Sequence, residues 1–426
     1  MSKFQIILLA VFGVFIVVAV LLFSVSKGSG TAAATVTVWG DMTTYDFSLL
    51  LNNAGLTGNN QLTIKYVEKS KDTFDTEFTE ALAEGRGPDL VLLPQSKIWK
   101  ARNKLLVIPG SSIAQKDFIN TFADEADLLI SSEGVYGLPL YIDPLVLYTN
   151  RDLLSKASYA NPPKYWDEIY DYAQKLTEKD TAGNISTSAI ALGESRNIPN
   201  AKDILALLML QAGTPITSFQ GADLRSALED NFNLPLLPSA AALDFYTQFS
   251  NSAKPYYTWN RSLLPANTSF ISGKSAFYIG YASELALLKA KNPTLSIGVA
   301  PVPQSRVSGK AVTYGKLGAI SVVKSASNPT AALQAALLLV SQNSASELAK
   351  ISSLAPARRD LLSERQTDPA KAVFYTAALQ SKGWIDPDDS KTGALFTDMI
   401  DSVTSGRART DEAISNASFA LDSLTK

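Results

Sequence analysis

Residues 134–154 constrain the fold more than any other stretch, because they read as two strands separated by a sharp break. The first strand is expected over 135–142, and the second continues through Tyr148. Between them, Pro144 lacks a backbone N–H and biases Asp143 toward an extended conformation, so we expect no single uninterrupted central strand here. The pattern predicts a crossover between two lobes.

The length of the chain supports two lobes. Of the 426 residues, about 390 remain once an apolar N-terminal segment is set aside. That is more than one hydrophobic core usually serves. The formal net charge is −2 and no basic cluster occurs, which argues against nucleic acid as a partner.

The residue inventory excludes several classes of enzyme and cofactor. The chain has no Cys and no His. This removes thiol nucleophiles, Ser-His-Asp triads, disulfides and zinc sites built on these residues, and we expect no cofactor or metal. Asp and Glu are plentiful, so a glycosidase with two carboxylates remains an alternative, although no pair stands out.

The N-terminal apolar run covers residues 4–25. As a helix it would be about 33 Å long, enough to cross a hydrocarbon core of about 30 Å. We expect a transmembrane anchor over residues 1–27 and a linker over 28–35, with the remaining chain on the extracytoplasmic side of a cell membrane. A cleaved signal peptide with its site near residues 32–34 is the alternative.

The rest of the chain alternates strand and helix patterns. Strands are expected at 35–39, 62–67 and 88–93, with an amphipathic helix over 72–84 between the last two. This order predicts a sheet layered with helices. A further helix over 203–212 is apolar on nearly all sides and ends at a glycine.

Several motifs, taken in order, resemble a known family. They are Tyr-Gly-Leu-Pro at 136–139, Asp143, Leu-Tyr-Thr-Asn-Arg-Asp-Leu-Leu at 147–154, the Gly-Lys turn and strand within 270–281, and Tyr-Gly-Lys-Leu-Gly at 314–318. Together they resemble the extracellular solute-binding proteins of ABC importers, a large group that includes many sugar binders.

The resemblance implies an α/β chain with the two-lobe, type II periplasmic-binding-protein-like fold. Lobe 1 would comprise residues 36–142 and 315–352, and lobe 2 residues 143–314 and 353–426. The implied function is capture of a small solute, with a carbohydrate as the first expectation, and its delivery to the permease subunits of an ABC importer. A membrane-anchored sensor or scaffold using the same clamp is the alternative, and anionic or amino-acid ligands stay open.

A sugar-binding cleft needs flat aromatic faces and polar groups that hydrogen-bond to hydroxyls. Residues of these kinds occur at strand ends, at the expected crossovers and near helix ends. The candidates are Trp39, Asp41, Tyr141, Asp143, Trp259, Tyr278, Tyr281, Tyr314, Arg358 and Trp384. The resemblance places the ligand-facing aromatic residue of lobe 2 near Tyr281 and further contacts near Trp39, Asp41, Trp384 and the Arg358-Arg359 pair.

Overall fold

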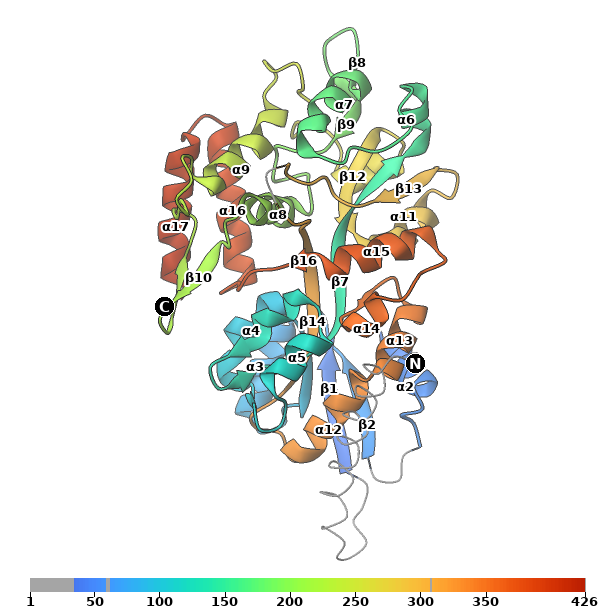
Figure 1. Ribbon diagram of the computed structural model, residues 1–426, viewed down its shortest axis with the longest axis vertical. Helices are drawn as coiled ribbons and strands as arrows, with labels where there is room; N and C mark the ends of the chain where they lie inside the picture. The colour runs from blue at the N-terminus through green and yellow to red at the C-terminus, as the bar shows by residue number, and fades with distance from the viewer. Residues whose placement is uncertain (1–33, 59–61, 307–308, 426) are drawn as a thin grey trace, which may run out of the picture.

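A computed structural model describes residues 34–58, 62–306 and 309–425 as two α/β lobes stacked along the long axis of the molecule (Figure 1). The expected anchor over residues 1–27 lies outside the described residues. Within the described ranges, no helix is both long and apolar enough to cross a bilayer. The first strand begins at Ala34, so the last two residues of the expected linker belong to the sheet.

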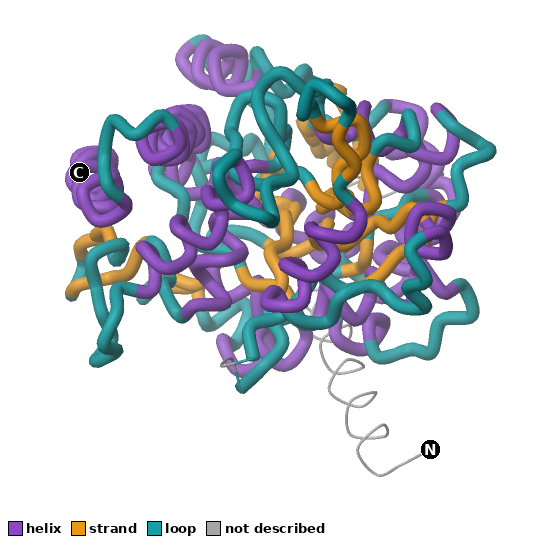
Figure 2. Tube along the Cα trace, turned by 90° about the horizontal axis from the view of Figure 1, so that it is seen from above, coloured by secondary structure: helices purple, strands orange, loops and turns teal. Residues whose placement is uncertain are grey.

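Lobe 1 is built on parallel strands that continue into an antiparallel pair. Its sheet has the order β2 (Leu62–Glu68), β1 (Ala34–Gly40), β3 (Leu90–Pro94), β14 (Thr313–Val322) and β7 (Leu138–Asn150). The helices are α2 (Thr44–Asn53), α3 (Phe74–Ala83), α4 (Gln95–Ala101), α5 (Gln115–Thr121), α12 (Pro329–Leu339), α13 (Gln342–Ile351) and α14 (Arg359–Leu362). Seen from the lobe 2 end, the molecule has helices around its central strands (Figure 2), as the alternating pattern predicted.

Lobe 2 continues the same sheet. Strand β7 pairs with β12 (Ser275–Tyr281) and β13 (Ile297–Ala300), and β12 pairs with β9 (Ile185–Ile190), which pairs with β8 (Glu178–Lys179). The helices are α6 (Arg151–Lys156), α7 (Ile169–Leu176), α8 (Ala201–Ala212), α9 (Pro238–Thr247), α10 (Ala266–Ile271), α11 (Leu285–Lys291), α16 (Asp389–Thr404) and α17 (Thr410–Thr425). A hairpin of β10 (Thr217–Gln220) and β11 (Asp223–Ser226) extends from this lobe.

Local signals explain where several helices begin and end. The side chain of Asn150 accepts hydrogen bonds from the backbone of Asp152 and Leu153 and so caps α6 at the expected position. Helix α8 ends at Gly213, whose φ of 100° lies in the left-handed region that glycine adopts without strain. This helix positions two residues of the site described below.

The prediction of a break at Pro144 was wrong, because β7 runs unbroken from Leu138 to Asn150. Its partners change at this point instead. The ladder with β14 ends at Pro144, opposite Gly315, and the ladder with β12 begins at Leu145. A residue without an N–H is tolerated where one ladder gives way to the next. The strand therefore joins the two lobes directly.

A third connection runs beside the two long strands. Helix α15 (Pro369–Leu379) is drawn between the lobes in Figure 1, and β16 (Ser381–Lys382) follows it and pairs with β14. Phe374 packs into the core of lobe 2, whereas Ala378 packs into that of lobe 1. Ala355 and Leu362 also belong to the first core, so lobe 1 extends beyond the boundary expected at residue 352.

Candidate ligand-binding cleft

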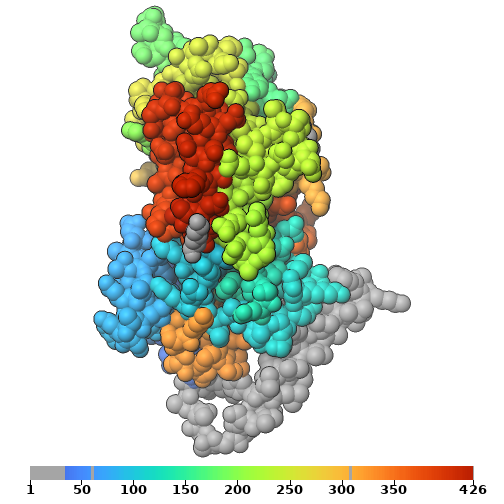
Figure 3. All heavy atoms as spheres, turned by 90° about the vertical axis from the view of Figure 1, so that its left-hand side faces the viewer, coloured from blue at the N-terminus to red at the C-terminus, as the bar shows by residue number. Residues whose placement is uncertain are grey.

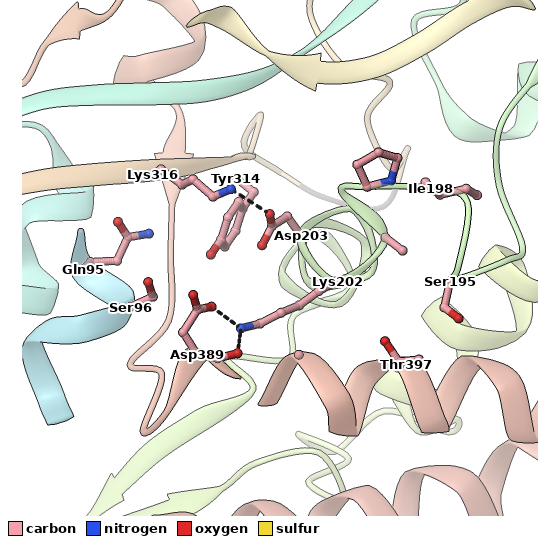
Figure 4. A pocket seen from close by; sticks show the side chains of 13 residues that line it. Gln95, Ser96, Ser195, Ile198, Lys202, Asp203, Tyr314, Lys316, Asp389 and Thr397 are labelled. Atoms are coloured by element: carbon pink, nitrogen blue, oxygen red, sulfur yellow. Dashed lines mark hydrogen bonds and ion pairs between the residues drawn. The ribbon is translucent and has the colours of Figure 1, made fainter. Parts of the chain in front are cut away.

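A pocket of about 320 Å³ lies between the lobes. Helix α4 contributes to it from lobe 1, helices α8 and α16 contribute from lobe 2, and strand β14 contributes from the connection between them (Figure 4). Most of the residues that line the pocket have polar or charged side chains. Among them are Gln95, Ser96, Lys202, Asp203, Tyr314, Lys316 and Asp389.

Lys202 is the centre of one charged group in the pocket. Its ammonium donates to Asp386 at 2.6 Å, to Asp389 at 2.7 Å and to the hydroxyl of Thr392 at 2.8 Å. Burial by itself lowers the pKa of Lys202, but the two carboxylates outweigh burial and raise it. The ammonium therefore stays charged and fixes Asp389 at the pocket edge. The ammonium also lies 5.5 Å from the centre of the Trp384 ring.

Asp203 is the centre of the other charged group. Its carboxylate accepts a hydrogen bond of 2.6 Å from the hydroxyl of Tyr281 and lies 3.2 Å from the ammonium of Lys316. That ammonium also lies 3.9 Å from the centre of the Tyr281 ring. Burial and the neighbouring Asp203 raise the pKa of Tyr281, which keeps its hydroxyl a neutral donor. The group links α8, β12 and β14.

Gln95 ties lobe 1 to the connecting strand beneath the pocket. Its side-chain amide donates to the carbonyl of Gly315 at 2.8 Å and accepts from the backbone N–H of Leu317. It also donates weakly, at 3.3 Å, to the buried carboxyl of Glu125. Burial raises the pKa of Glu125 to about 7, against a smaller lowering by a hydrogen bond with Ser381.

Three of the ten candidate residues lie at or next to the pocket. Tyr314 lines it, Tyr281 contacts it through Asp203, and Trp384 packs beneath Lys202. All three are almost fully buried, with exposed fractions of 3 to 4%. Among the described residues that line it, the pocket wall is therefore mainly polar, and Tyr314 is its aromatic member.

Asp143 and Tyr141 lie on β7 where the lobes join. The carboxylate of Asp143 accepts from the backbone N–H of Ser283 at 2.9 Å and from its hydroxyl at 2.6 Å. Burial raises the pKa of Asp143 to about 6, although both Ser283 bonds and the nearby Lys316 lower it. Tyr141 packs against Gly318, where any side chain would overlap its ring. Both residues hold the connection between the lobes together.

Trp39 and Asp41 lie at the end of β1, as predicted, but do not line the pocket. The Lys69 ammonium lies 4.0 Å from the centre of the Trp39 ring, and Lys71 lies 3.5 Å from the Asp41 carboxylate. Both side chains remain partly exposed.

The structure places three other candidates away from the pocket. Trp259 is fully buried in the core of lobe 2, and its indole N–H donates to Asn197 at 3.0 Å. Tyr278, also buried, donates its hydroxyl to Glu284 at 2.6 Å. Arg358 is buried in lobe 1 and pairs with Asp360 at 2.9 Å. Since burial and internal partners account for all three, we leave them out of the site.

None of the four charged residues that line the pocket, Lys202, Asp203, Lys316 and Asp389, was among the candidates from sequence. Gln95, Lys202 and Asp389 lie near the beginnings of helices, whereas the search for candidates concentrated on strand ends. Two signals were available. Asp203 opens the predicted apolar helix 203–212, and Lys316 lies within the crossover motif 314–318.

Two α/β lobes, connecting strands between them and a polar pocket at their junction define a clamp-type ligand-binding protein. The model of a family described as bacterial extracellular solute-binding protein matches residues 54–400. The chain belongs to this family. It is therefore an extracytoplasmic binding protein and not an enzyme.

Solved structures of low sequence identity share the fold. A cyclo/maltodextrin-binding protein complexed with maltotetraose is 19% identical, with 93% of this chain and 98% of that chain covered and a TM-score of 0.74. A cyclic α-maltosyl-1,6-maltose binding protein from Arthrobacter globiformis is 16% identical, with 93% and 100% covered and a TM-score of 0.74. A galacto-N-biose/lacto-N-biose I-binding protein of an ABC transporter from Bifidobacterium longum is 16% identical, with 92% and 97% covered and a TM-score of 0.68.

Proposed function

We propose that this protein captures a carbohydrate in the interlobe pocket and delivers it to the permease subunits of an ABC importer. The observation that carries the proposal is the origin of the pocket's polar groups, which come from both lobes and from β14. A ligand can touch all of them only when the lobes are together, so binding favours the closed form.

The chemistry of the pocket suits a ligand rich in hydroxyl groups. Asp203 and Asp389 present carboxylate oxygens, Lys316 presents an ammonium and Gln95 an amide. Charged hydrogen-bonding groups of both signs recognise hydroxyls, which both donate and accept. The volume of about 320 Å³ is near the lower end of the roughly 300–1,000 Å³ that ligand pockets span, which favours a short saccharide. The solved relatives that bind sugars support the same class.

Thermal unfolding of the purified full chain tests this proposal. A ligand present at about 100 times its Kd, binding only the folded state, adds about 2.7 kcal/mol and raises the unfolding midpoint by a few degrees. We expect one class of saccharide to produce this shift and amino acids, polyamines and phosphate esters to produce none. A panel without any shift would contradict solute capture and favour a sensor whose partner is another protein.

Asp203→Asn provides the residue-level test. The substitution keeps the shape of the side chain but removes its charge. A hydrogen bond to a charged group is worth about 1.5–3 kcal/mol, so affinity for the saccharide should fall roughly tenfold to a hundredfold, measured by calorimetry. Asp398→Asn is the matched control, because Asp398 lies on α16, is largely exposed and pairs only with Arg407 among the described contacts. Equal affinity in both variants would remove Asp203 from the site.

We further propose that residues 1–27 form an uncleaved anchor that holds the clamp on the outer side of a cell membrane. The support is the length of the apolar run over residues 4–25. Mass spectrometry of the protein extracted from its native membranes should find the N-terminal peptide intact. A mature chain beginning near residue 32 would show instead that the segment is a signal peptide.

A further inference from the structure

The lobes also touch outside the pocket, on the side where α4 faces the β10–β11 hairpin. The rings of Trp99 on α4 and Phe219 on β10 meet edge to face, with centroids 5.7 Å apart and an interplanar angle of 62°. One residue further along α4, the ammonium of Lys100 lies 3.1 Å from the carboxylate of Asp388, which caps α16. In Figure 3 the yellow-green part of lobe 2 that includes the hairpin rests against lobe 1.

Lobe 2 presents Phe219 on a well-anchored hairpin. Leu224, paired opposite Phe219, is buried. The backbone N–H of Ser226 donates to Asp422 on α17 at 2.7 Å, and the hydroxyl of Thr217 donates to the carbonyl of Ile385 at 2.8 Å. Phe219 itself remains 49% exposed. The Phe219 ring thus projects from lobe 2 and contacts the Trp99 ring of lobe 1.

Contacts within lobe 1 hold Trp99 and Lys100 in position. The guanidinium of Arg102 lies 4.0 Å from the centre of the Trp99 ring and donates to the backbone carbonyl of Trp99 at 2.7 Å. Lys100 is also held by Asp75, at 3.5 Å. Since each side is positioned by its own lobe, the contact forms with little loss of side-chain freedom when the lobes meet.

Trp99 and Phe219 do not line the pocket, although Ser96 on α4 and Asp389 on α16 do. The aromatic contact is therefore adjacent to the pocket and independent of what fills it. It exists only while the lobes are together, so its free energy counts toward the closed form alone.

We propose that Trp99 and Phe219 form a latch that holds the lobes closed and raises ligand affinity without touching the ligand. An edge-to-face aromatic pair corresponds to about a twofold to tenfold change in an equilibrium constant. The ion pair of Lys100 and Asp388 adds less, because the Lys100 side chain is half-exposed. The predicted effect on affinity rests on the proposed function, whereas the effect on lobe opening does not.

The lobe separation can be measured directly, because the chain contains no Cys that would react with a label. Glu80→Cys on α3 and Ala241→Cys on α9 place two spin labels at exposed positions, one in each lobe. In the ligand-free full chain, pulsed electron spin resonance should show more molecules at long distances in Phe219→Ala. The ratio of open to closed molecules should rise about twofold to tenfold. Phe219→Tyr should restore the short distance.

Matched variants separate the latch from general effects of substitution. Phe419→Ala, at a Phe that is 81% exposed on α17, should leave the distances unchanged. Trp99→Ala should reproduce the effect of Phe219→Ala, and the double variant should open no further than either alone. Additive opening, or distances in Phe219→Ala identical to those of the unaltered chain, would overturn the proposal.

Ligand binding supplies the second readout. Phe219→Ala should weaken saccharide affinity by the same factor by which it lowers the fraction of molecules in the closed form, because apparent affinity is proportional to that fraction. Unchanged affinity together with shifted distances would overturn the role of the latch in binding. If no saccharide binds the unaltered chain, the proposed function fails, and the distance measurements still decide whether the latch exists.

Discussion

Glu125 is a carboxyl group that the fold buries beneath the ligand pocket. It is 1% exposed and faces the backbone of Gly315 and Gly383, and its Oε2 atom has no hydrogen-bond partner. Burial raises its pKa to about 7, from an ordinary value of 4.5. The neutral form is thus favoured in the folded chain, since a buried carboxylate with only weak hydrogen-bond partners is costly.

Stability should therefore fall as pH rises through the neutral range. A group whose pKa is raised on folding binds more protons in the folded state, so its contribution is fully present below about pH 4.5 and is lost above about pH 7. The loss amounts to roughly 3 kcal/mol. Glu125→Gln, which cannot ionise, should remove the slope between pH 6 and pH 8 in urea unfolding, whereas Asp143, whose pKa burial raises to about 6, keeps a slope at lower pH. The same slope in Glu125→Gln would contradict the assignment.

Of the candidate residues, Tyr314 lines the pocket and Tyr281 lies next to it. Both were proposed because they fall at the end of a strand and in a crossover motif. Trp259 shows why the same signal fails elsewhere. A large aromatic residue near a strand buries area wherever it falls, and whether its face opens into a cleft depends on tertiary packing.

At the scale of elements, β7 and β14 hold the lobes together. Each strand contributes to both lobes, and the antiparallel ladder between them ends where Gly315 lies opposite Pro144. Gly315 lies so close to Glu125, Ile142 and Ser381 that any added side chain would overlap them. The junction is packed around a residue without a side chain.

Gly315→Ala should accordingly destabilise the junction. The new methyl group must displace the Glu125 carboxyl, a methyl group of Ile142 and the Cβ of Ser381, and overpacking of this kind typically costs about 1–3 kcal/mol. Urea unfolding at a fixed pH measures the loss. Gly110→Ala is the control, because a Cβ there meets nothing within 4 Å and should change stability little. Equal stability of the two variants would show that the junction relaxes freely.

The elements also show the limit of local signals. The Asn150 cap and the Gly213 helix end followed from residue chemistry, because each depends on a few neighbouring positions. The continuity of β7 through Pro144 did not. Whether a missing N–H breaks a strand depends on which partner stands opposite, and that partner, β14, lies far away in the sequence.

At the scale of the molecule, two cores share their connecting strands. Leu140 on β7 belongs to the core of lobe 1, and Leu147 on the same strand belongs to the core of lobe 2. The length of the chain predicted two cores. It carried no information on how tightly the cores are coupled, which depends on the shared strand and on α15.

Coupling through β7 predicts that damage to one lobe weakens both. Leu140→Ala and Leu147→Ala each remove a fully buried side chain and should cost about 2–5 kcal/mol. Because β7 belongs to the sheets of both lobes, loosening one half of the strand should also weaken the lobe that holds the other half. Slow hydrogen exchange, measured by mass spectrometry, should therefore accelerate in both lobes of each variant. Leu337→Ala, at a leucine that is 41% exposed on α12, should leave exchange nearly unchanged. Faster exchange confined to the substituted lobe would mean that the lobes unfold independently and that β7 transmits no stability between them.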